Sequence, residues 1–340
     1  MGPTVDTVLR RGRETALAGR WREARRLFRM AAVDTTPLLR DRALAADAHR
    51  WCSIAAMRLG DWAAASADAR QALRAARGLA DIGREARSLN VAGAIEFERG
   101  NWAAAIELFS KARLLARMAT DRPLQARIDN NEGALWAARG IPARARRLYA
   151  SALAGFRAGH EDGPAARVMN NLGLTILQEG AAAEAGEWFR RAAAAARQRK
   201  DADLLLTVLI NAARAAAEGG ELARARAGAA EARILAERMD GGPALADLAC
   251  TLAVIACVER RWASADEWIG LALEASKDGG NPLAAADALE QRARVRLVQG
   301  RFGGAEREIE KARAAYAALG ADGAVARLDR LASRLPLTQA

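Results

Sequence analysis

The chain of 340 residues is poor in the side chains that most often carry chemistry or cross-links. It has three cysteines and two histidines, and only 5% of its residues are aromatic. Cys52, Cys250 and Cys257 form no CxxC pair, so we expect core thiols rather than a disulfide framework or a zinc site. His49 and His160 have no nucleophile or carboxylate placed around them, and no glycine-rich phosphate loop is present. The sequence therefore predicts a non-enzymatic protein with no metal and no cofactor.

Two larger patterns are also missing. The N-terminal residues lead into arginines without an apolar run, and no later run could serve as a membrane span. We therefore expect a cytoplasmic protein without a membrane partner. No segment alternates β-branched and polar residues with a period of two, so the predicted fold class is all-α.

What the chain does contain is a register of 40 residues. Glycine recurs at Gly60, Gly100, Gly140, Gly180, Gly220 and Gly300, with Gly19 one residue out of step and Arg260 in the one remaining place. An alanine stands five residues after each of these positions: Ala24, Ala65, Ala105, Ala145, Ala185, Ala225, Ala265 and Ala305. Another stands twelve residues after: Ala31, Ala72, Ala112, Ala152, Ala192, Ala232, Ala272 and Ala312. Such a register is typical of a repeat array.

One unit shows the repeat most openly. Leu172-Gly173 precede Gly180, and Ala185 precedes Phe189 by four residues. This resembles the tetratricopeptide repeat, in which Leu-Gly lies in the first helix and Ala-x3-Phe in the second. The period of 40 exceeds the usual ~34, and the family's early Trp and late Pro are lacking, so the chain is similar to a long-period variant.

The resemblance implies a right-handed superhelical solenoid of about eight antiparallel helix pairs with a C-terminal capping helix. We expect one solenoid over 1–340, with an N-terminal repeat at 5–40, seven 40-residue repeats at 41–320 and the cap at 321–334. First helices should begin near 5, 41, 82, 122, 163, 202, 243 and 282. Second helices should begin near 21, 62, 102, 142, 182, 222, 262 and 302. Asp before Pro or Gly near 121, 162, 240 and 278 marks helix starts.

A polar ladder runs through the first helices. Three consecutive units have arginine thirteen residues before the register glycine and asparagine three residues later, and a second line of asparagines runs through Asn131, Asn171 and Asn211. Residues three and four apart share one helix face, so the set should line one wall. Its members are Arg87, Asn90, Arg127, Asn130, Asn131, Arg167, Asn170, Asn171 and Asn211.

In the family that the chain resembles, these first-helix positions line a concave groove that binds an extended peptide. An asparagine amide can donate to and accept from a peptide unit, and a guanidinium can hold a carboxylate with two bonds. The alternative is that these side chains are solvated or cap neighbouring helices.

Charge changes sign along the predicted groove. The arginine position holds Asp47, Thr207, Asp247 and Asp287 in the outer units. Residues 1–200 contain 34 Lys plus Arg against 21 Asp plus Glu, whereas residues 201–280 contain 8 against 13. We therefore expect a groove that is basic in the middle and more acidic toward its C-terminal side.

The net charge of +11 also raises the question of nucleic-acid binding. No helix-turn-helix, zinc finger or stacking platform is present, and the tryptophans fall at core positions, which argues against nucleic acid. The sequence instead predicts an adaptor that binds an acidic or carboxyl-terminated protein or peptide segment in its groove. The alternative is the sensing part of a bacterial signalling or transcription system, which binds a peptide or small ligand and acts through a separate output protein.

Overall fold

The computed structural model describes residues 4–33, 39–239, 244–278 and 281–335, and within these ranges every regular element is an α-helix. The first eight are α1 (Val5–Leu17), α2 (Trp21–Val33), α3 (Leu39–Arg58), α4 (Trp62–Gly78), α5 (Ile82–Glu98), α6 (Trp102–Met118), α7 (Arg122–Ala138) and α8 (Pro142–Ala158). They are followed by α9 (Asp162–Gln178), α10 (Ala182–Gln198), α11 (Ala202–Glu218), α12 (Leu222–Glu237), α13 (Ala244–Val258), α14 (Trp262–Asp278), α15 (Pro282–Val298), α16 (Phe302–Leu319) and α17 (Asp322–Ala332).

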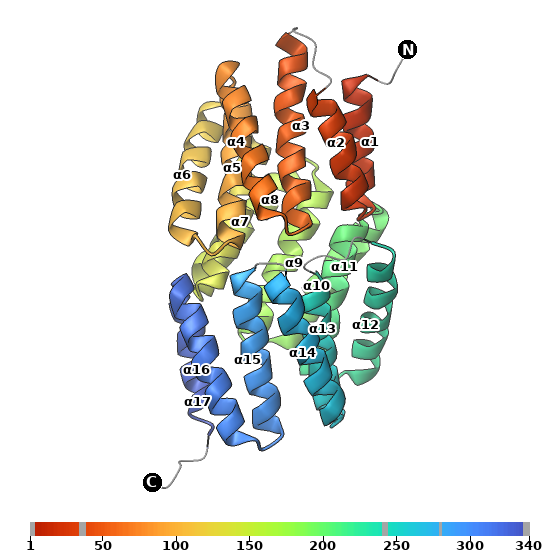
Figure 1. The fold of residues 1–340 in the computed structure, drawn as a ribbon, viewed down its shortest axis with the longest axis vertical. Coiled ribbons are helices and arrows are strands. Elements are labelled where there is room, and N and C mark those ends of the chain that lie inside the picture. The colour runs from red at the N-terminus through yellow and green to blue at the C-terminus, as the bar shows by residue number, and fades with distance from the viewer. Residues whose placement is uncertain (1–3, 34–38, 240–243, 279–280, 336–340) are drawn as a thin grey trace.

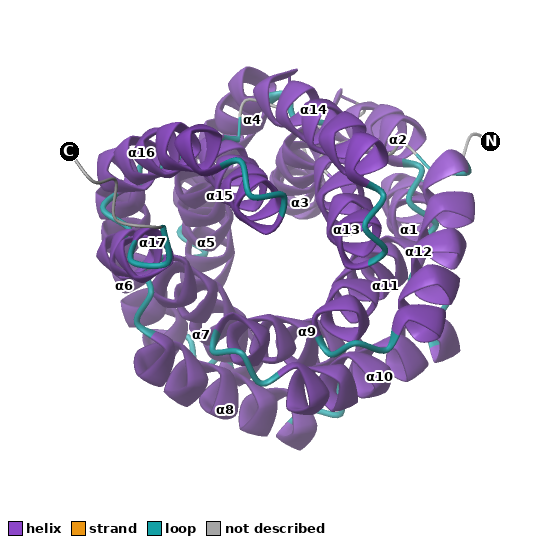
Figure 2. Ribbon diagram, turned by 90° about the horizontal axis from the view of Figure 1, so that it is seen from below, coloured by secondary structure: helices purple, strands orange, loops and turns teal. Residues whose placement is uncertain are grey.

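These helices form eight antiparallel pairs, from α1/α2 to α15/α16, and α17 packs on the last pair. The predicted all-α solenoid with a terminal helix is confirmed. The pairs wind around a common axis, with α1 to α4 at one end of the molecule and α13 to α17 at the other (Figure 1). Seen along that axis, first helices such as α7, α9, α13 and α15 lie inside, and second helices such as α8, α10 and α16 lie outside (Figure 2).

Small residues in the first helices make room for rings on the second helices. A Cβ atom added to Gly133 would lie 2.5 Å from the Tyr149 ring, and one added to Gly93 would lie 2.6 Å from the Phe109 ring. Both rings are almost fully buried. The register alanines of the second helices are also buried, at 0–1% exposure. Close helix contact therefore explains why these positions repeat.

The joints explain the register glycines. Each joint from a first to a second helix places one residue in the left-handed region, with φ from +72° to +89° where it is Gly60, Gly100 or another register glycine. Arg260 takes the same conformation with φ of 59°. Where the structure describes the opposite joints, these also hold a left-handed residue, such as Thr120 or Lys200. The glycine register did not reveal this feature, because most of these residues have side chains.

Most described helix starts lie within two residues of their predicted places. Asp121 caps α7, since its Oδ1 accepts a hydrogen bond from the Leu124 amide at 3.0 Å. At the next start of a first helix, the predicted position near 163, directly after Asp162, was one residue late. Helix α9 begins at Asp162 itself, and the preceding Glu161 makes no side-chain capping bond. The predicted start signals in 240–243 and at 279–280 lie outside the described residues.

Two predictions about burial need correction. Cys52 and Cys250 are buried as expected, but Cys257 is only half-buried. The tryptophans were assigned to the core, and Trp21, Trp102 and Trp136 are buried, but the other five are only half-buried: Trp51, Trp62, Trp188, Trp262 and Trp268. None of the helices among the described residues combines the length and apolar character needed to cross a membrane.

The superhelix closes onto itself after roughly four and a half repeats, so that residues 182 or 183 positions apart touch. Trp21 Nε1 donates to Asp203 Oδ1 at 2.9 Å, and Asn281 Nδ2 donates to Glu98 Oε2 at 2.8 Å. Farther along, the Gly323 amide donates to the Arg139 carbonyl at 3.1 Å. We call this set of contacts between α1–α8 and α11–α17 the seam.

Candidate functional site

The predicted asparagines meet on the first helices and form one connected chain of amides. Asn131 Nδ2 donates to Asn90 Oδ1 of the preceding repeat at 3.1 Å, and Asn171 Nδ2 donates to Asn130 Oδ1 at 3.0 Å. The series ends where Asn211 Nδ2 donates to Asn170 Oδ1 at 3.0 Å. The ladder therefore links four consecutive repeats through side chains.

Within this ladder the two asparagine positions differ in burial. Asn90, Asn130 and Asn170 are 4–8% exposed, whereas the neighbouring Asn131 and Asn171 are half-buried. Each amide group has two N–H donors, and the bonds between repeats use one donor of Asn131 and one of Asn171. The ladder thus has a structural role between repeats, and its half-buried members keep donors that can face a ligand.

The three arginines lie one turn away and pair with the start of the next repeat. Arg87 contacts Asp121 at 2.5 Å, Arg127 contacts Glu161 at 2.5 Å, and Arg167 lies 3.7 Å from Asp203. Their side chains are 39–47% exposed. Contacts with neighbouring helices, the alternative role for these residues, therefore account for part of the hydrogen bonding of the three arginines. The distance from Arg167 to Asp203 is the longest of the three.

Sequence reasoning missed a further basic member. Arg50 of α3 occupies the same register position as Asn90, Asn130 and Asn170, so the 40-residue spacing could have found it. Burial lowers the pKa of Arg50 to about 10, with the positive charges of Arg87, Arg127 and Arg13 acting in the same direction and Asp47 opposing them. The first helices α1, α3, α5 and α7 thus bring arginines together on one side.

The acidic side that the sequence predicted is also present. The side chain of Asp247 in α13 is accessible to solvent, but only on the inside of the solenoid, where other helices surround it. Loss of bulk solvent, together with the negative charges of Asp287 and Glu98, raises its pKa to about 7 despite the nearby Arg214. Burial also raises the pKa of Asp287, whose Oδ1 accepts a hydrogen bond from the Tyr316 hydroxyl at 2.5 Å.

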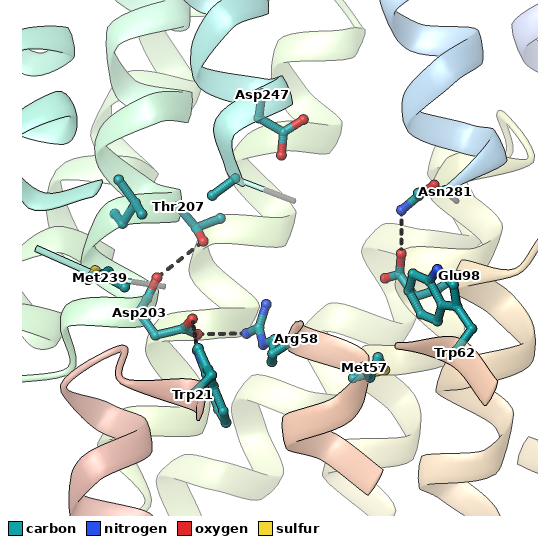
Figure 3. A pocket seen from close by; sticks show the side chains of 12 residues that line it. Trp21, Met57, Arg58, Trp62, Glu98, Asp203, Thr207, Met239, Asp247 and Asn281 are labelled. Atoms are coloured by element: carbon teal, nitrogen blue, oxygen red, sulfur yellow. Dashed lines mark hydrogen bonds and ion pairs between the residues drawn. The ribbon is translucent and has the colours of Figure 1, made fainter. Parts of the chain in front are cut away.

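A cavity of about 200 Å³ lies where the seam meets the first helices. In Figure 3, Asp247 and Thr207 stand on one side of it, Arg58 and Asp203 at its base, and Glu98 with Asn281 opposite. Trp21, Met57, Trp62 and Met239 add apolar surface. The cavity is smaller than the ~300 Å³ of typical small-molecule sites, so it suits one side chain or end group of a longer ligand.

No protein-family model and no curated protein sequence matches the chain. Solved structures are similar in fold. A Rap protein complexed with competence and sporulation factor aligns at 13% identity and a TM-score of 0.64, covering 97% of each chain. The Rap conjugation gene regulator of plasmid pLS20, in complex with the Phr* peptide, aligns at 14% identity and a TM-score of 0.69, covering 90% of this chain and 81% of that one.

A third structure, of the APC/C heterotetramer Cut9–Hcn1, aligns at 14% identity with a TM-score of 0.62, over 95% of this chain and 55% of that one. All three likenesses show the fold. The chain therefore has the fold of a tetratricopeptide-like superhelical solenoid, as the Leu-Gly and Ala-x3-Phe pattern predicted.

Proposed function

We propose that the protein binds an extended peptide segment along the inner helices and performs no chemical step. Support comes from the inner helices, where α5, α7 and α9 have arginines, α7 and α9 have half-buried asparagines, and α13 and α15 have the carboxylates Asp247 and Asp287. A segment with an acidic group or a free carboxyl terminus complements the arginines, and the asparagine amides match peptide units.

The repetition of the polar set is the observation that carries this proposal. The same pair of side chains occurs in α7 (Arg127 and Asn131) and, one repeat later, in α9 (Arg167 and Asn171). A segment already bound at one repeat meets the second at a high effective concentration. Ordering a flexible segment costs free energy, so contact with several repeats is needed for useful affinity.

The test compares two quadruple alanine variants. One removes the inner set, Arg127, Asn131, Arg167 and Asn171. The matched control removes exposed polar residues of the outer helices, Ser110, Arg147, Arg157 and Gln198. Each variant is used to recover bound chains and peptides from cells that express the protein, and identified segments are then titrated by calorimetry.

We expect the inner variant to lose at least a hundredfold in affinity while the control binds as the unchanged protein does. Both variants must retain helicity by circular dichroism. Equal recovery of the same segment by the inner variant would show that the inner wall is not the binding surface.

A second candidate function is a sensor in which the peptide is a signal. Two of the similar structures are Rap proteins solved with a peptide or factor bound, and one aligns over almost its whole length. In a sensor the bound peptide must change the affinity for another protein, since coupling between sites defines such regulation. Recovery of a second protein in equal amount with and without the peptide would argue for the simple adaptor.

A further inference from the structure

The seam cavity has more carboxylates than guanidinium groups in its wall. Its charged lining consists of Glu98, Asp203 and Asp247 on one hand and Arg58 on the other. Arg58 is already engaged, since its guanidinium lies 2.7 Å from Asp203 Oδ2. Arg167, which is not part of the lining, lies 3.7 Å from the same oxygen. Even when Arg167 is counted, three carboxylates face two guanidinium groups, and both of these groups lie next to Asp203.

The other two carboxylates, Glu98 and Asp247, have no guanidinium partner within the part of the chain that the structure describes. Glu98 Oε2 accepts a hydrogen bond from the uncharged amide of Asn281 at 2.8 Å. Asp247 is near Arg214, but that arginine is paired with Glu218 at 2.9 Å. Loss of bulk solvent raises the pKa of both carboxyl groups. A cation that the chain itself does not supply would stabilise their charged forms.

The two carboxylates belong to different superhelical turns, with apolar surface between them. Glu98 comes from α5 and Asp247 from α13, and in Figure 3 the Asp247 carboxylate points into the cavity from the side opposite Glu98. The lining also includes the indole of Trp62 and the thioether chains of Met57 and Met239. An indole face attracts an organic cation, and methionine packs against its hydrocarbon part. A bare metal ion would leave this apolar surface uncovered.

We propose that the seam cavity binds an alkylammonium group, with its nitrogen between Glu98 and Asp247 and its hydrocarbon chain against Trp62. An ammonium group has three N–H donors, which is enough to reach both carboxylates. The volume of about 200 Å³ suits one end of such a molecule. The inference does not depend on the proposed peptide binding, because it concerns a ligand of the opposite charge at a different place.

Binding at this site should depend on pH, because a proton and the ammonium group compete for the same carboxylates. Loss of bulk solvent and the neighbouring negative charges raise the pKa of Asp247 to about 7. An alkylammonium group keeps its own proton at this pH, so its affinity should rise from pH 6 to pH 8. Apart from Glu98 and Asp247 themselves, the charged groups around the pair lie on α3, α11 and α15: Arg58, Asp203, Arg214 and Asp287.

The experiment titrates the full chain with 1,5-diaminopentane by calorimetry at pH 6 and at pH 8. In parallel titrations, 1-pentanol tests the hydrocarbon chain alone, and magnesium chloride tests positive charge alone. The peptide acetyl-Gly-Lys-Gly-amide tests an ammonium group on a protein side chain. Asp247→Asn and Glu98→Gln each remove one charge at nearly constant size. The matched control is Glu274→Gln, which changes an exposed carboxylate on α14, and circular dichroism verifies the helicity of each variant.

We expect 1,5-diaminopentane to bind the unchanged protein and Glu274→Gln equally. Asp247→Asn and Glu98→Gln should each bind it about tenfold more weakly, because each loses a hydrogen bond between charged groups. The affinity of the unchanged protein should be higher at pH 8 than at pH 6, and this rise should be absent in Asp247→Asn. Neither 1-pentanol nor magnesium should bind as tightly as the diamine.

The proposal is wrong if neither the diamine nor the lysine peptide binds the unchanged protein, or if 1-pentanol or magnesium binds as tightly. It is also wrong if both cavity variants keep the affinity of the unchanged protein. Equal affinity at pH 6 and pH 8 would contradict it without the use of any variant. The diamine and the lysine peptide present the same chemical group, so the tighter of the two shows whether the ligand is a free amine or a side chain of another protein.

Discussion

The N-terminal and C-terminal halves of the solenoid use the same register positions for different purposes. At the position thirteen residues before the joint, α5, α7 and α9 have arginine, whereas α13 and α15 have aspartate. At the small position of the first helix, α5, α7 and α9 have glycine against an aromatic ring, whereas α13 and α15 have alanine against isoleucine. The repeat therefore determines where a side chain lies, and the residue type at each unit determines what that place can do.

The carboxylates of the C-terminal half show how strongly local partners matter. Glu290 is buried, and the Arg327 and Arg294 guanidinium groups lower its pKa to about 2 against the effect of burial. Asp247, on the neighbouring inner helix, has no such partner among the described residues, and its pKa is raised. Glu290 thus stabilises the fold when it is charged, whereas Asp247 does so when it is protonated.

The largest effect should come from Glu290→Gln. Arg327 and Arg294 would lose their shared partner, and we expect a loss of roughly 3 kcal/mol in the free energy of unfolding at pH 7. Because the pKa of Glu290 is lowered by folding, its stabilisation is present above pH ~4.5 and lost as the pH falls toward 2. Urea unfolding followed by circular dichroism measures this.

The matched control is Glu306→Gln, an exposed residue on α16. A difference between the two variants of less than about 1 kcal/mol would show that the Glu290 cluster does not stabilise the C-terminal end.

An intermediate effect should follow from Gly133→Ala in the N-terminal half. The added Cβ would lie 2.5 Å from the Tyr149 ring, and we expect a destabilisation of about 1–3 kcal/mol from overpacking. The control Gly186→Ala adds a methyl group with nothing within 4 Å and should be neutral or slightly stabilising. Equal melting temperatures for the two variants would mean that the glycine–ring contact can relax without cost.

The smallest effect should be that of Asp247→Asn, and it should depend on pH. Because folding raises the pKa of Asp247 to about 7, its contribution to stability is complete below pH ~4 and is lost as the pH rises through 7. The variant has no such loss, so its melting temperature relative to the unchanged protein should rise between pH 5 and pH 8.

The groups that face Asp247 are Asp287 on α15, Glu98 on α5 and Arg214 on α11. Glu274→Gln, which changes an exposed residue on α14, serves as the control. Its melting temperature relative to the unchanged protein should stay constant between pH 5 and pH 8. If the relative melting temperature of Asp247→Asn is also constant over this range, Asp247 and Glu290 do not respond to pH in opposite ways.

The sequence predicted the fold well because each repeat makes mostly local contacts. Glycine at the joint, alanine at the helix crossing and a ring beside Gly133 are each required within one helix pair. The ladder was also visible, since Asn131 and Asn171 share a register. What the ladder bonds to was not visible, because Asn131 donates to Asn90 across a repeat boundary. The groove role assigned to its members remains a prediction.

The sequence by itself determined the helix pairs, their small crossing residues and the change of charge along the inner wall, because these follow from spacings shorter than one repeat. Only the tertiary structure decided which residues meet across the seam. The meeting of Trp21 and Arg58 with Asp203 depends on the pitch of the superhelix, which adds up small rotations over more than four repeats. No local pattern encodes that sum.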